Sequence, residues 1–122
     1  MTADRARIAQ LIQEVIDSLP PELKANLQNV DFVLEEEPDP GLRKRGLGQN
    51  LLGLYQGIPL PKRGRGYSFV LPDKITLYTK NIQRVTSDQK TWEEKVKEVV
   101  LHEIGHYFGL NEAEIQALWK KM

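Results

Sequence analysis

Cysteine is absent from this sequence of 122 residues, and histidine occurs at two positions, His102 and His106. The lack of cysteine excludes disulfide bonds, thiolate catalysis and cysteine-ligated zinc sites. The scarcity of histidine excludes a metal site of three histidines within one chain. Any metal that this chain binds must therefore take His, Asp, Glu or water as its ligands.

Net charge is absent as well, because 17 basic residues balance 17 acidic ones. A neutral chain is not attracted as a whole to nucleic acid or to an anionic membrane. No apolar run approaches the roughly 20 residues of a transmembrane helix, and the N-terminus lacks the apolar segment of a signal peptide. We therefore expect a soluble, cytoplasmic protein with no membrane contact.

The length fits a single domain, residues 1–122, without a signal for any particular oligomeric state. Apolar residues at helical spacing predict an amphipathic helix over residues 3–18. A second helix is expected to run to residue 108, with candidate starts at residues 86–88 and at Thr91, where Glu94 would complete a capping box. Gly109 is a natural left-handed terminator for it. Asn111 can then cap a short C-terminal helix.

Three apolar, β-branched stretches predict strands over residues 30–35, 51–60 and 74–82, with a shorter extended segment at 67–71. The prolines near the end of the second stretch indicate an edge strand. Gly53 within it suggests a bulge or the close approach of another part of the chain. Helices and strands together indicate an α+β fold with a small sheet.

The most informative stretch, residues 102–112, contains both histidines. At 3.6 residues per turn, His102 and His106 project from one helix face about 40° apart, so both imidazoles can reach one metal ion. Glu103 points about 100° further round. It should therefore stand beside the metal rather than bind it, which suits a base acting on an activated water.

A catalytic zinc site typically has three protein ligands and an open position. Glu112 is the strongest candidate for the third ligand, because a chain reversal at Gly109 lets its carboxylate swing back towards the histidines. Glu98, one helical turn before His102, is the alternative. The stretch then fits the pattern H-E-x-x-H-x-x-G-x-x-E.

This pattern resembles the zincin metallopeptidases, with the spacing of the metzincin motif and a glutamate where histidine or aspartate is usual. The chain as a whole is similar to the small bacterial zincin-like family of minimal metalloproteases. The similar stretches are residues 52–60, 71–78 and 99–110, together with the end of the first helix. The resemblance implies a compact minimal zincin fold, in which a small mixed sheet packs against the active-site helix between an N-terminal helix and a short C-terminal helix.

The resemblance also implies a zinc-dependent metallopeptidase that acts on a peptide or protein substrate. Zn²⁺ would be held by His102, His106 and Glu112, and Glu103 would be the general base towards a zinc-activated water. An extended substrate could align along the edge strand at 51–60. Three tyrosines are candidates for stabilising the oxyanion. They are Tyr55, Tyr78 and Tyr107.

Two other functions are compatible with the residues. One is a zinc-binding interaction module that keeps the zincin fold with little or no proteolytic activity, since a small domain leaves little room for a deep specificity pocket. The other is a nucleic-acid accessory protein that uses the basic clusters at 43–45 and 62–65. Few aromatic residues lie among these basic residues, and the net charge is zero, so nucleic-acid binding is disfavoured.

Overall fold

The computed structural model describes residues 4–44, 50–63 and 72–121. These residues form an α+β fold, as the sequence predicts. In chain order the elements are α1 (Arg5–Ser18), α2 (Pro21–Asn26), β1 (Val30–Glu35), α3 (Pro40–Lys44), β2 (Gly53–Gln56), the 3-10 helix η1 (Leu60–Lys62), β3 (Asp73–Tyr78), α4 (Thr79–Arg84), α5 (Gln89–Tyr107) and α6 (Glu112–Lys121).

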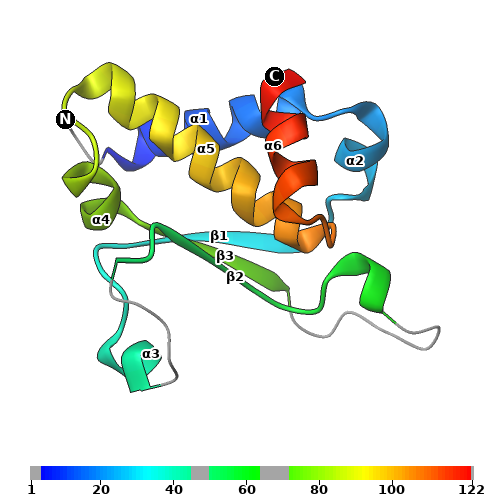
Figure 1. The fold of residues 1–122 in the computed structure, drawn as a ribbon, viewed down its shortest axis with the longest axis horizontal. Coiled ribbons are helices and arrows are strands. Elements are labelled where there is room, and N and C mark those ends of the chain that lie inside the picture. The colour runs from blue at the N-terminus through cyan, green and yellow to red at the C-terminus, as the bar shows by residue number, and fades with distance from the viewer. Residues whose placement is uncertain (1–3, 45–49, 64–71, 122) are drawn as a thin grey trace.

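The three strands form one mixed sheet in the order β1-β3-β2. β1 runs parallel to the central strand β3, and β2 runs antiparallel to it, with Gly53 paired to Leu77. Within the described residues β2 therefore lies at an edge of the sheet, as its prolines predict. Figure 1 shows α1, α5 and α6 on one side of this sheet, with α5 nearest to the strands.

Helix α5 is the centre of the core, since it contacts α1, α4, α6, β2 and β3. Its predicted apolar side is buried, and Trp92 and Val100 are fully inaccessible to solvent. The apolar side of α1 faces it and buries Ile8, Leu11 and Val15. Burying these side chains holds α5, and hence both histidines, between the sheet and α1.

Two predicted strands are too long. β3 ends at Tyr78 instead of Ile82, because its last partner on β1 is Glu35 and no ladder continues beyond that pair. The chain turns into α4 instead. β2 covers four residues of the predicted 51–60, since its pairing stops at Gln56 and a side chain at Gly57 would meet the Asp73 carboxylate.

Of the two starts that the sequence offers for α5, the structure uses the earlier one. The N-cap is Asp88, whose side chain accepts a hydrogen bond from the Thr91 backbone at 2.8 Å, while the Thr91 side chain caps Asp88 in return. The capping box therefore joins Asp88 to Thr91 instead of Thr91 to Glu94. The predicted extended segment at 67–71 and parts of both basic clusters lie outside the described residues. Among the residues that the structure does describe, no helix is long and apolar enough to cross a membrane.

Candidate metal centre

The last turns of α5 present the two histidines side by side. The ring centroids of His102 and His106 lie 4.6 Å apart, with the rings nearly perpendicular. Gly109 then adopts a φ of 73°, and the backbone amide of Leu110 donates to the Gly105 carbonyl at 2.9 Å. This left-handed residue ends α5 and reverses the chain, as the sequence predicts.

Helix α6 begins directly after this reversal and carries Glu112 in its first turn. Asn111 caps it: its side chain accepts from the Glu114 amide at 2.8 Å, and the Glu114 carboxylate accepts from the Asn111 amide at 2.9 Å. α6 packs closely on α5, because Gly105 leaves room there for the buried side chain of Ile115. The cap and this contact together fix the position of Glu112 at the start of α6.

The predicted ligands converge. One donor atom from each of His102, His106 and Glu112 lies within 4.8 Å of the others. His102 Nε2 is 3.0 and 3.1 Å from the two carboxylate oxygens of Glu112. Two imidazoles and one carboxylate are a donor set that zinc accepts, and three protein ligands leave a position open. The residues present therefore fit a zinc ion.

Glu98, the alternative ligand, points elsewhere. Its carboxylate pairs with Lys95 at 3.0 Å, one turn away on the same helix. It is not part of the converging group of described residues. Geometry therefore favours Glu112 for the third position.

Glu103 is buried, with 6% of its surface exposed, and its Oε2 lies 2.9 Å from His102 Nδ1. A carboxylate at this nitrogen holds the imidazole in one orientation, with Nε2 directed at the ligand group. Burial lowers the pKa of His102, but the hydrogen bonds and charges of Glu103 and Glu112 outweigh it and leave the pKa raised. A protonated ring can donate to both carboxylates at once.

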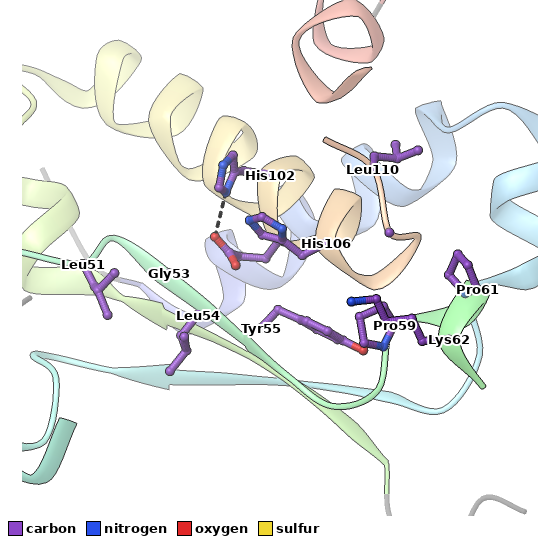
Figure 2. Close-up of a pocket in the computed structure, with 12 residues that line it drawn as sticks. Leu51, Gly53, Leu54, Tyr55, Pro59, Pro61, Lys62, His102, His106 and Leu110 are labelled. Atoms are coloured by element: carbon purple, nitrogen blue, oxygen red, sulfur yellow. Dashed lines mark hydrogen bonds and ion pairs between the residues drawn. The ribbon is translucent and has the colours of Figure 1, made fainter. Parts of the chain in front are cut away.

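A pocket of about 550 Å³ opens beside these groups (Figure 2). Its walls come from β2 and the segment before it, from the stretch around η1, and from the end of α5. Lining residues include Leu51, Gly53, Leu54, Tyr55, Pro59, Pro61, Lys62, His102, Glu103, His106 and Leu110. A pocket of this size suits a small ligand or a few residues of a peptide.

A second cavity of about 200 Å³ shares His102 and Glu103 with the first. It lies between α5 and α6 and is lined by apolar side chains that include Leu52, Val99, Ile115 and Trp119. Buried Glu103 thus borders two cavities, a larger one along β2 and a smaller apolar one.

Each of the three tyrosines proposed as oxyanion donors either donates its hydroxyl to another group or does not line the pocket. Tyr107 is fully buried, and its hydroxyl donates to the Asn26 carbonyl at 3.0 Å. Tyr78 is buried and does not line the pocket. Tyr55 does line the pocket, but its hydroxyl donates to Asp73 at 2.6 Å. Burial and then the Asp73 carboxylate raise the pKa of Tyr55, so its proton is held firmly.

Sequence reasoning missed the part of the site around η1. Lys62 lines the pocket, whereas the neighbouring Arg63 is buried against Asp73. The available signal is the basic cluster at 62–65, which the sequence by itself connects only with a disfavoured contact to nucleic acid. The pairing of Arg63 with a residue on β3 could not be seen from local sequence.

The fold and the site define an α+β protein with a candidate His–Glu metal centre at the end of its central helix. Residues 27–120 match the family described as zincin-like metallopeptidase, and the chain belongs to this family. It is also similar to a solved structure, a conserved hypothetical protein from T. thermophilus, with a TM-score of 0.53 and 25% identity over 98% of this chain and 100% of that one. No curated protein matches the chain significantly.

Proposed function

We propose that this protein is a zinc-dependent metallopeptidase that hydrolyses peptide bonds in the pocket beside α5. The observation that carries the proposal is the convergence of His102, His106 and Glu112 next to the buried carboxylate of Glu103. Membership of the zincin-like metallopeptidase family supports the same chemistry. We also infer that the protein acts in the cytoplasm on peptides or proteins rather than on nucleic acid.

In this proposal the two histidines and Glu112 hold the metal. Zinc at such a site supplies Lewis acidity towards water and towards a peptide carbonyl. Glu103 fixes the orientation of the His102 ring, since the hydrogen bond at Nδ1 leaves Nε2 facing the other two ligands.

Glu103 acts as the general base and then as the general acid. Its carboxylate borders the pocket, so it can accept a proton from the attacking water and return it to the leaving amine.

The edge strand β2 provides the docking site for an extended substrate. It pairs with β3 on one side, and Leu54 and Tyr55 line the pocket. A peptide can add to such an edge through backbone hydrogen bonds while its side chains enter adjacent recesses. The apolar cavity between α5 and α6 is one such recess for a side chain near the cleaved bond.

The test compares wild-type protein with Glu103→Gln on a peptide library, with zinc and with a chelator. We expect zinc-dependent cleavage by the wild type, and a fall of about 100- to 10,000-fold in kcat for Glu103→Gln at saturating zinc. Zinc affinity should fall by no more than about 10- to 100-fold, because Glu103 only hydrogen-bonds the ligand His102. Glu94→Gln, an exposed glutamate on the same helix, is the matched control and should retain full activity.

The competing function is a zinc-binding interaction module. It gains support from the commitment of the Tyr55 and Tyr107 hydroxyls to other partners, which leaves neither as an oxyanion donor. If zinc-loaded wild type and Glu103→Gln both bind zinc and neither cleaves any peptide, the module replaces the peptidase.

A further inference from the structure

One charged residue of the large pocket has no part in the proposed chemistry. Lys62 is exposed, and among the described residues it is the only lysine or arginine that lines this pocket. Figure 2 places it beside Pro59 and Pro61, at the end of the pocket opposite Leu51. A cation in a largely apolar wall is a feature that fixes the orientation of an anionic ligand.

The backbone of Lys62 is firmly placed. Its amide donates to the Pro59 carbonyl at 2.9 Å, which closes the turn of η1. Pro61, the residue before it, packs against the reversal at the end of α5, where a Cβ on Gly109 would lie 2.9 Å from the proline ring. The lysine therefore projects from a turn that is braced on the metal-bearing helix.

The neighbouring residue Arg63 has a structural role instead. Arg63 is 6% exposed, pairs with Asp73 on β3, and donates from Nε to the Ile58 carbonyl at 2.8 Å. Its guanidinium also lies 5.1 Å from the centre of the Tyr107 ring. These contacts tie the η1 turn to the sheet and neutralise the arginine's charge.

Lys62, by contrast, takes part in no ion pair with the residues that the structure describes. Of the two adjacent cations, Arg63 is structural and Lys62 remains available to a ligand. The braced turn fixes the backbone of Lys62 beside the pocket, while its exposed side chain still loses rotamer freedom when it binds, which keeps the expected preference modest.

We propose that Lys62 binds a carboxylate of the substrate, so that the enzyme prefers peptides with an acidic side chain or a free C-terminus at the Lys62 end of the pocket. This proposal rests on the peptidase function proposed above. The ammonium group attracts either carboxylate by the same charge–charge interaction. Because Lys62 is exposed, we expect a preference of about two- to tenfold, which salt should weaken.

The test uses matched peptides that differ only in one carboxylate. One series, blocked at both ends, carries Glu, Gln or Lys at each position in turn. A second series has a free or an amidated C-terminus on a sequence without acidic residues. Cleavage is measured as kcat and KM, and binding to metal-free wild type is measured by fluorescence anisotropy at low and high salt. The first series reports on side chains and the second on the chain terminus.

The variants are Lys62→Met, Lys62→Glu and the control Lys90→Met, a lysine exposed at the start of α5. Wild type and Lys90→Met should prefer the carboxylate peptide of one series, mainly through KM and Kd. Lys62→Met should lose the preference, and Lys62→Glu should favour a Lys peptide over its Gln match. A folded Lys62→Met that keeps the preference contradicts the proposal.

The two proposals fail in different ways. Preferential, Lys62-dependent binding without cleavage of any peptide supports the carboxylate site and contradicts the peptidase. Cleavage without preference in either series supports the peptidase and overturns the carboxylate site. Equal binding of every matched pair, or no binding at all, also overturns it.

Discussion

His102 Nε2 lies 3.0 Å from Glu112 Oε1, although the two residues belong to different helices and are ten positions apart. The contact exists because Gly109 reverses the chain and Asn111 starts α6 at once. A histidine nitrogen that faces a carboxylate in this way is placed for both to bind one cation. The first prediction tests this relationship directly.

Glu112→Gln should weaken zinc binding by about 100-fold or more, since even residues that only hydrogen-bond a ligand are worth about 10- to 100-fold. The measurement is zinc affinity by competition with a chromogenic chelator. Glu98→Gln is the matched control on α5 and should bind zinc as the wild type does. The reverse result, with Glu98→Gln weakened and Glu112→Gln unchanged, would assign the third ligand to Glu98.

Gly105→Ala should loosen the contact between α5 and α6. The added methyl carbon would lie 2.5 Å from Ile115 Cγ1, so α6 must shift and carry Glu112 with it. Overpacking of this kind costs about 1–3 kcal/mol, which exceeds the roughly 1 kcal/mol that alanine gains over glycine in a helix. Chemical denaturation should show lower stability, and the chelator assay should show weaker zinc binding.

The double variant Gly105→Ala/Ile115→Ala provides the control for that prediction. Truncating Ile115 removes the atoms that the new methyl group meets, so zinc affinity should recover towards the wild-type value even if stability does not. A single variant Gly105→Ala with wild-type stability and wild-type zinc affinity contradicts the steric argument.

Asp73→Ala should destabilise the protein by about 3–5 kcal/mol, because it leaves the buried guanidinium of Arg63 without its carboxylate. The hydrogen bond from the Tyr55 hydroxyl is lost as well. The pair variant Asp73→Leu/Arg63→Met removes both charges and should be more stable than Asp73→Ala. Urea denaturation of the three proteins checks this order, and equal stability of Asp73→Ala and wild type would show that the pair is not needed.

The pairing of Arg7 with Glu93 predicts a pH dependence. Arg7 donates to both Glu93 oxygens, at 2.6 and 3.0 Å, and this hydrogen bonding lowers the Glu93 pKa to about 2. A carboxylate with a lowered pKa in the folded state stabilises the fold above its ordinary pKa, and that contribution is lost as the pH falls towards about 2. Glu93→Gln should therefore lower the Tm at pH 7 and have a much smaller effect at pH 2.

Thermal melts of wild type, Glu93→Gln and the exposed control Glu22→Gln between pH 7 and pH 2 measure this effect. The Tm difference of Glu93→Gln should shrink below about pH 4.5, where an unpaired glutamate begins to take up protons. A difference that stays constant across the range would assign the effect to packing between α1 and α5 instead of to charge.

The sequence predicts most of α1, β1 and α5, because apolar periodicity, caps and terminators act within a few residues. The sequence also anticipates that His102, His106 and Glu112 lie close together in space, since all three fall within eleven residues around one glycine. Their role as metal ligands stays a prediction. The strand ends are wrong because they depend on partners far away in the chain, such as the pair between Glu35 and Tyr78.

The different environments of Lys62 and Arg63 likewise depend on contacts with residues distant in the chain. The two residues are adjacent and chemically alike, yet one faces the pocket and the other is buried. What separates them is Asp73, ten residues after Arg63 and on another element. Local composition describes both as members of one basic cluster, and the distinction comes only from tertiary pairing.

The same ion pair has a consequence for the rigidity of the pocket. Arg63 and Asp73 join the η1 turn, and with it one wall of the pocket, to the central strand β3. Helix α5 packs on the same strand, so the pocket wall and the two histidines share one support. Losing the ion pair should therefore loosen the pocket as well as lower the stability of the fold.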